Sequence, residues 1–270
     1  MLSHYRTGSE SIEIAARRSF FAAAPASFGC GVFDMSGTSA ALLRVAAMPS
    51  PIMNRVVGLP GDTALDDATL ARITELFRER DIPQFWVHVW DGPGNGALRD
   101  SLLARGFQPQ GSWAKFVCEL DGFTPPAPAS GLAVRRAGKH EFGLAGQILC
   151  DSFGMPPVLV PWMAGLNEAA GWQVYFACDA QGVPVATGAL LVDGPNAWLG
   201  MGATLPAARR QGSQQMLMAV RLAAARAAGC GIAAVEADAQ VRHSINNIQR
   251  AGFRPVGTRS NYLCPVDFTV

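Results

Sequence analysis

The sequence has no excess of charge of either sign, and this absence argues against partners that are themselves highly charged. Its 270 residues include 22 Lys and Arg against 21 Asp and Glu, which gives a formal net charge of +1 and an isoelectric point near 7.6. Runs of like charge are also lacking. Proteins that bind nucleic acids or anionic membranes usually carry a basic patch. We therefore expect neither a nucleic-acid partner nor a membrane partner.

Long apolar runs and paired cysteines are lacking as well. No segment reaches the roughly 18 uninterrupted apolar residues of a membrane span. The six cysteines stand singly, without a C-x-x-C pair or Cys/His spacing, which favours buried thiols over disulfides or metal ligands. The stretch that begins at Arg17 resembles an export signal, but Pro25 and Gly29 interrupt it. With 49% apolar residues, the composition predicts a globular cytoplasmic protein without a metal site.

One junction, from Ala197 to Leu217, contains the clearest chemical signal. An apolar extended run ends at Pro206, a basic turn containing Arg209, Arg210 and Gly212 follows, and apolar residues then recur at helical spacing. A helix N-terminus presents unpaired N–H groups and a partial positive charge, which favour an anion such as phosphate. An ordinary turn with solvated arginines is the alternative.

The remaining pattern predicts an α/β protein with two domains. Prolines and small residues between 123 and 131 mark a linker, so we predict domains at 1–122 and 132–270. Short turns between the extended runs at 173–178, 183–192 and 197–204 predict an antiparallel meander. Other predicted elements are helices at 11–23, 65–80, 97–105, 142–153, 211–228 and 243–251, and strands at 28–34, 40–47, 52–59, 85–90, 113–120, 132–137, 232–238 and 258–264.

The two halves repeat the same turn residues at an offset of 146 positions. Gly106-Phe107 corresponds to Gly252-Phe253, and Pro60 corresponds to Pro206. So many matches without an insertion indicate a tandem duplication. The first copy has three aspartates between residues 61 and 69, where the second has its basic turn. These carboxylates cap a helix well and repel phosphate, so the first copy should not bind the same anion.

The second half resembles the GCN5-related N-acetyltransferase (GNAT) superfamily. The family pattern is a strand, a proline and R/Q-x-x-G-x-G/A at the start of a helix, and here residues 209–214 read R-R-Q-G-S-Q after Pro206. Gln214 departs from the pattern at its last position. The resemblance implies two tandem GNAT-like domains, each a mixed, mostly antiparallel sheet flanked by helices, with a degenerate N-terminal copy. It also implies splayed central parallel strands in the C-terminal copy.

The same resemblance implies that acetyl-CoA is bound as a co-substrate. Its pyrophosphate would lie on backbone amides of the basic turn, and its pantetheine arm would pair with the end of the preceding strand like an added strand. An asparagine on the short helix before Gly252-Phe253 would also touch the cofactor. The implied cofactor-binding residues are Gly202, Ala203, Thr204, Arg209, Arg210, Gln211, Gly212, Ser213, Gln214, Ser244 and Asn247.

The catalytic groups are less clear from the sequence. The family often places a tyrosine acid four positions before the Gly-Phe glycine, and Ile248 stands there. Tyr262 is the substitute acid, with packing as the alternative. Glu236 and Asp238 lie on one face of a strand and are candidates for a base, or for a helix cap or salt bridge. His243 could act as a base but is more typical of an exposed residue near a helix start. Cys264 could act as a nucleophile but is more typical of a buried, inert thiol.

These features predict acetyl transfer from acetyl-CoA to a primary amine of a small molecule. A non-catalytic acyl-CoA sensor is the alternative, because the usual acid is missing, and transfer of a longer acyl chain is a third possibility. The segment from Phe153 to Trp172 would form the acceptor wall. Its large apolar side chains either line an apolar slot or pack on the sheet: Met155, Trp162, Met163 and Trp172. The acceptor and the oligomeric state, including a homodimer, stay open.

Overall fold

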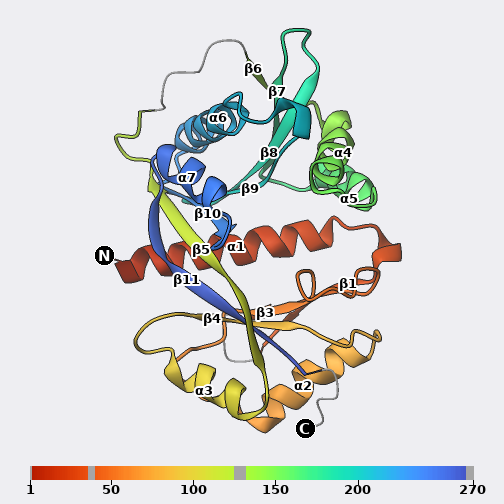
Figure 1. Cartoon of the computed structure of the whole chain (residues 1–270), viewed down its shortest axis with the longest axis vertical. Coiled ribbons are helices and arrows are strands. Elements are labelled where there is room, and N and C mark those ends of the chain that lie inside the picture. Colours follow the sequence, from red (N-terminus) through yellow and green to blue (C-terminus); the bar gives the residue numbers. More distant parts are fainter. Residues whose placement is uncertain (1, 36–39, 125–131, 266–270) are drawn as a thin grey trace. The chain divides into compact units, whose positions relative to one another are not determined.

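A computed structural model of the chain describes residues 2–35, 40–124 and 132–265 (Figure 1). The chain divides into two compact units. Unit 1 consists of Met1–Pro25, Lys115–Ala237 and Val241–Val256, and unit 2 consists of Ala26–Ala114, Asp238–Gln240 and Gly257–Val270. The units therefore cut across the predicted domain bounds. Most of the predicted linker, residues 125–131, lies outside the described residues.

Unit 1 contains a mixed sheet with the strand order β5-β10-β9-β8-β7-β6. The predicted meander is confirmed, because β7 (Trp172–Cys178), β8 (Pro184–Asp193) and β9 (Asn196–Thr204) pair antiparallel. Beside β9, β10 (Ile232–Asp238) runs parallel. The outer strands are β6 (Ala133–Arg136) and β5 (Gln108–Glu119).

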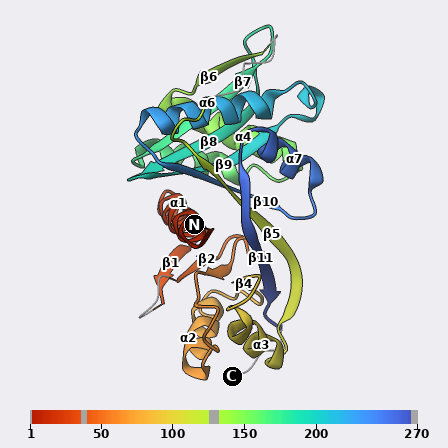
Figure 2. The same cartoon turned by 90° about the vertical axis from the view of Figure 1, so that its left-hand side faces the viewer.

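Helices cover both faces of this sheet. On one side lies α6 (Ser213–Ala227), which crosses β8 and β9 in Figure 2, and on the other lie α4 (Phe142–Phe153) and α5 (Leu159–Gly165), as Figure 1 shows. The bounds of α4 match the sequence prediction, and Gly154 ends the helix in a left-handed conformation with φ of 64°. The short helix α7 (Arg242–Arg250) follows β10.

The N-terminal helix α1 (Leu2–Ala22) also belongs to unit 1 and starts nine residues before the predicted Ser11. Its last turn packs on α5: the rings of Phe20 and Trp162 stack with centroids 4.4 Å apart, and Trp162 Nε1 donates a hydrogen bond to the Phe20 carbonyl. Near the start of the helix, the Tyr5 hydroxyl donates to Glu119 of β5 at 2.6 Å, and tertiary contacts of this kind support turns that the apolar pattern does not predict. Among the described residues, no helix is long and apolar enough to cross a membrane.

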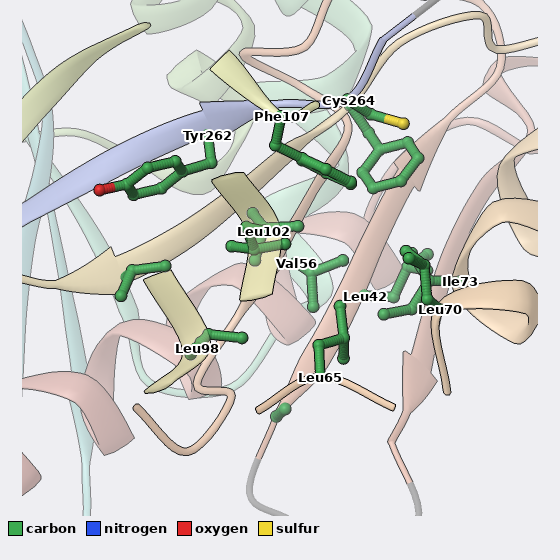
Figure 3. Packing of buried hydrophobic residues seen from close by; sticks show 14 of the residues in the cluster. Leu42, Val56, Leu65, Leu70, Ile73, Leu98, Leu102, Phe107, Tyr262 and Cys264 are labelled. Carbon is green, nitrogen blue, oxygen red and sulfur yellow. The ribbon is translucent and has the colours of Figure 1, made fainter. Parts of the chain in front are cut away.

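Unit 2 has the strand order β1-β2-β3-β4-β11. Strands β1 (Cys30–Asp34), β2 (Ala41–Val45) and β3 (Arg55–Val57) pair antiparallel, and β3 runs parallel to β4 (Trp86–Trp90). The helices α2 (Asp67–Arg78) and α3 (Gly96–Ala104) lie on the same side of these strands (Figure 2). Leu42, Val56, Ile73, Leu102 and Phe107 form part of an apolar core between the strands and the helices (Figure 3).

Each unit takes its last strand from the other half of the sequence. In unit 1, the neighbour of β10 is β5, the last strand of the first half, and the Leu120 amide donates to the Gly231 carbonyl. In unit 2, β4 pairs antiparallel with β11 (Arg254–Leu263), the last strand of the second half. The tandem halves have thus exchanged their last strands, and neither half holds a complete unit.

Candidate functional site

The parallel strands β9 and β10 diverge in unit 1. Their register joins Ile232 to Asn196 and ends at Ala234 with Trp198, although β9 continues to Thr204 and β10 to Asp238. On its other edge, β9 has an irregularity opposite Gly188, where Met201 adopts a left-handed φ of 52°. A bulge of this kind bends the strand and disrupts its ladder. The end of β9 therefore has backbone groups that the sheet does not use.

A buried arginine supports this bulge. Arg221 of α6 is 3% exposed and donates from Nη1 to the carbonyls of Ala189 and Gly200. Its guanidinium fills the space above Gly188, where a Cβ would lie 2.6 Å from Cζ. Burial lowers the pKa of Arg221 to about 10, so the group stays charged at neutral pH. Arg221 was not among the predicted functional residues, although a lone arginine on the apolar face of a helix is a signal in the sequence.

The loop between β9 and α6 presents amides at the start of the helix. Arg210 has φ of 65° and Gly212 has φ of 83°, so two left-handed residues lie within three positions. Alternating backbone conformations of this type turn successive N–H groups inward and form an anion-binding concavity. In the part of the chain that the structure describes, no side chain caps α6 at Gly212. The predicted basic turn is thus a helix start with its amides available.

Ser213 adds a second, independent feature to this loop. The residue is 3% exposed, and its Oγ has no hydrogen-bond partner within residues 2–35, 40–124 and 132–265. A buried hydroxyl without a partner is unfavourable unless a bound group completes its hydrogen bonds. The uncapped amides and this hydroxyl lie in the same helical turn, and both fit an anionic ligand such as a pyrophosphate.

Two side chains of the loop contact the end of β9. Arg209 is exposed, and it donates from Nη2 to the Ser152 carbonyl of α4 at 2.9 Å and from Nε to the Thr204 carbonyl at 3.3 Å. Gln214 donates from Nε2 to the Ala203 carbonyl and to Thr204 Oγ1, both at 3.0 Å. The loop is therefore tied to the diverging strand by Arg209 and Gln214.

The predicted asparagine also comes close to this loop. Gln215 in the first turn of α6 donates from Nε2 to the Asn247 carbonyl of α7 at 2.6 Å, and Arg250 donates to Asn247 Oδ1. Ser244 lies one turn earlier on α7 and is half-buried. Unit 1 thus contains the whole predicted cofactor-binding set, and Gln215 connects its loop with α7.

Glu236 lies in a buried ion cluster of unit 1. Its carboxylate pairs with Arg17 of α1 and with Lys115 of β5, and Lys115 also pairs with Glu13 at 2.9 Å. The side chains of Lys115, Glu13 and Glu236 are 4%, 5% and 8% exposed. The cavity beside them measures about 10 Å³, enough for roughly one water molecule. Each Glu236 oxygen contacts a cation, so accepting a substrate proton would require breaking an ion pair.

The other two candidate catalytic residues belong to unit 2. Asp238 is exposed and accepts the Gln240 amide at 2.8 Å. Tyr262 is 6% exposed and lies in the apolar core beside Leu102 and Phe107, and its hydroxyl points away from the labelled apolar side chains in Figure 3. Burial, followed by the charge of Asp91, raises the pKa of this phenol. The surroundings of Tyr262 give its ring a packing role.

The remaining candidates have simpler surroundings. His243 is exposed at the start of α7. Cys264 is buried, and burial raises the pKa of its thiol to about 12, which keeps the sulfur protonated and a weak nucleophile. Ile248 is 3% exposed and packs inward. Among the described residues, no group of three or more His, Cys, Asp or Glu side chains is placed to hold a metal ion.

Most of the large apolar side chains of the predicted acceptor wall are buried against other elements of unit 1. Trp162 and Met163 are fully buried, and Trp172 is 5% exposed and donates from Nε1 to Ser19 Oγ. Trp172 also contacts the ring of Trp198 edge-on. These three side chains hold α1 and α5 on the sheet. Met155 is only half-buried, and Phe153 is 63% exposed at the end of α4.

Comparison with known proteins gives a consistent fold. No family model and no curated protein matches the sequence. Among solved structures, a GCN5-related N-acetyltransferase from Kribbella flavida aligns with a TM-score of 0.65 over 96% of each chain, at 20% identity. The chain has the GNAT fold. A GNAT protein from Sphaerobacter thermophilus aligns with a TM-score of 0.62 and 15% identity over 87% of this chain and 82% of its own.

A tandem arrangement of the GNAT fold also has a solved counterpart. A tandem GNAT protein from the clavulanic acid biosynthesis pathway aligns with a TM-score of 0.62 and 16% identity over 88% of this chain and 86% of its own. The predicted mixed α/β GNAT fold is therefore confirmed, and this neighbour supports the predicted tandem organisation. At these identities the likeness concerns the fold, so the chemistry has to be argued from the residues of unit 1.

Proposed function

We propose that unit 1 binds acetyl-CoA and that the protein transfers its acetyl group to a primary amine of a small molecule. The loop from Arg209 to Gln214 supports this proposal most strongly. Its 15-residue helix has no side-chain cap among the described residues, and the buried Ser213 hydroxyl has no hydrogen-bond partner there; two left-handed residues precede the helix. Amides of this loop would hold the pyrophosphate, and the Arg209 and Arg210 side chains would add positive charge.

The rest of the proposed cofactor site follows the divergence of β9 and β10. The backbone of Gly202, Ala203 and Thr204 would pair with the amides of the pantetheine arm, as an added strand does. Ser244 and Asn247 on α7 would contact the arm or the phosphates. Bound acetyl-CoA supplies an activated thioester, which an amine attacks directly. The protein then has to orient the amine, polarise the carbonyl and exclude water.

The groups that move protons stay proposals. Within unit 1, Glu236 would accept the proton of the amine after one of its ion pairs breaks. Tyr262 as the acid and Asp238 as a second base remain predictions from the sequence. The substitutions Tyr262→Phe, Glu236→Gln and Asp238→Asn test these roles. A catalytic role predicts a lower kcat, unchanged acetyl-CoA affinity and a shifted pH profile. For Tyr262 and Glu236, a purely structural role predicts a lower melting temperature with a normal pH profile.

The alternative is a protein that senses acyl-CoA without turnover. Buried Ile248 at the position of the family's tyrosine favours it. Isothermal titration with acetyl-CoA and CoA, followed by detection of free thiol with a panel of amines, separates the two functions. Saturable binding with thiol release on at least one amine would support the enzyme. Binding without release on any amine would support the sensor, and absence of binding would contradict both.

A further inference from the structure

We propose that the Gln214 side chain occupies part of the pantetheine site and must leave when acetyl-CoA binds. This inference rests on the proposed function. The Gln214 amide spans the end of β9: Nε2 bonds to the Ala203 carbonyl and to Thr204 Oγ1, and Oε1 lies 3.0 Å from the point where a Cβ on Gly202 would stand. One side chain therefore covers the three residues with which the arm would pair.

The chemistry of the side chain matches that of the ligand it would exclude. A pantetheine arm contains secondary amides, and a glutamine amide offers the same N–H donor and C=O acceptor. An extended amide chain that adds to a strand uses the backbone acceptors of that strand. The Ala203 carbonyl faces β8, because Leu205, two residues further along, donates its amide to that strand, so the arm would use the backbone groups of Gly202 and Thr204. Gln214 lies against both of these residues, and protein and ligand then compete for the same place.

This competition is expected only where a long side chain occupies the last position of the motif, as Gln214 does here. In the family pattern that residues 209–214 resemble, the last position holds glycine or alanine, and neither has a side chain that could reach the strand. The offset of 146 places Ala68 at the corresponding position of the first copy. Gln214 is unbranched and half-buried in the first turn of α6, so it can rotate away without moving the helix.

The Gln214 side chain should therefore lower the affinity of the protein for ligands that carry a pantetheine arm and leave the affinity for other phosphate ligands unchanged. A ligand with a pantetheine arm has to displace Gln214, whereas adenosine 3′,5′-bisphosphate has phosphates and no arm. The substitution Gln214→Ala should therefore tighten acetyl-CoA binding by about tenfold, the effect of one or two net hydrogen bonds. The affinity for the bisphosphate should stay unchanged.

Isothermal titration of the full chain with both ligands tests this proposal. Gln147→Ala on α4, which removes the same group from a position where it donates to Asp151 of its own helix, serves as the control. Tighter acetyl-CoA binding by Gln214→Ala alone, with equal bisphosphate affinity, would support the inference. Equal or weaker acetyl-CoA binding by this variant would overturn the inference and leave the proposed function intact. Absence of binding of both ligands to every form would overturn the proposed function itself.

A second measurement does not depend on the variant. In nitrogen-labelled protein, the side-chain amide resonances of Gln214 should shift when acetyl-CoA is added and move toward the values of a solvated glutamine. The bisphosphate should leave them in place. Resonances that keep their positions at saturating acetyl-CoA would contradict displacement of the side chain.

Discussion

Two strand-to-helix crossovers of this chain differ at the residue that precedes the helix. Asp67 begins α2 and Ser213 begins α6, 146 positions later. Before α2, Asp66 has an extended backbone and accepts the amide of Thr69 at 2.8 Å and its hydroxyl at 2.7 Å. Before α6, Gly212 is left-handed and has no side chain to offer. One helix is capped by its own carboxylate, and the other presents its positive end outward.

The predicted duplication accounts for two crossovers that share their geometry and differ in their chemistry. Both crossovers connect parallel strands through a helix. In the first copy the carboxylate of Asp66 meets the exposed amides, and the hydrogen bonds from Thr69 hold the pKa of this carboxyl below its usual value. An anion cannot bind where a carboxylate already lies. The first copy therefore stabilises its helix, and the second leaves room for a ligand.

We expect the largest effect, loss of folding, when the two halves that exchange their last strands are separated. A fragment of residues 132–270 lacks α1 and β5, which complete unit 1, and should remain unfolded because buried groups such as Glu236 lose their partners. Circular dichroism and hydrogen exchange of the fragment measure this. Coexpression with residues 1–124 should restore a folded complex. A fragment that folds alone and binds acetyl-CoA would show that each half is self-sufficient.

The exchanged strands also differ in buried charge. Lys115 of β5 and Asn261 of β11 are 146 positions apart, but only Lys115 forms the ion pairs with Glu13 and Glu236. Lys115→Met should destabilise the protein by about 3–5 kcal/mol, because it leaves buried carboxylates short of a cation. Urea denaturation measures the change, and Lys115→Arg, which keeps the charge, is the control. A loss below about 1 kcal/mol would mean that Arg17 alone compensates the cluster.

Placing the first copy's carboxylate in the second copy should remove cofactor binding. Gly212→Asp puts a negative charge at the helix start and should weaken acetyl-CoA binding by about a hundredfold or more. Gly194→Asp makes the same change at another left-handed glycine of unit 1, with φ of 54° and open space for a Cβ, and should bind normally. Equal affinities in titrations of the two variants would remove the loop from the cofactor site.

Removing the capping charge from the first copy should have the smallest effect on stability. Asp66→Asn keeps an acceptor for the Thr69 amide but removes the charge, so stability near neutral pH should fall slightly while acetyl-CoA affinity stays unchanged. The pKa of Asp66 is lower in the folded than in the unfolded chain. Its contribution is therefore present above the usual carboxyl pKa and disappears as the pH falls below it.

Paired urea titrations at neutral pH and well below the ordinary carboxyl pKa of 3.8 measure this dependence. The stability difference between the native protein and Asp66→Asn should shrink on acidification. A difference that grows at low pH would contradict the assignment of Asp66 as a charged cap.

The sequence by itself determined most local elements and the repeat. The bounds of α4 were predicted correctly, because apolar spacing and Gly154 define them within a few turns of chain. The offset of 146 also relates Gly96–Ala104 of α3 to Arg242–Arg250 of α7. Glycine and proline set these turns through their own backbone geometry, so no distant partner is needed. The basic turn before α6 was visible for the same reason.

Only the tertiary structure decided which groups meet. Strand periodicity gives the face of a residue but not the neighbouring strand, so the exchange of β5 and β11 could not be predicted. The partners of Glu236 come from α1 and β5, more than a hundred residues away in sequence. Gln214 likewise looked like a departure from a pattern until its bonds to Ala203 and Thr204 showed what it covers. Long-range pairing depends on the whole folded chain, and local patterns do not contain it.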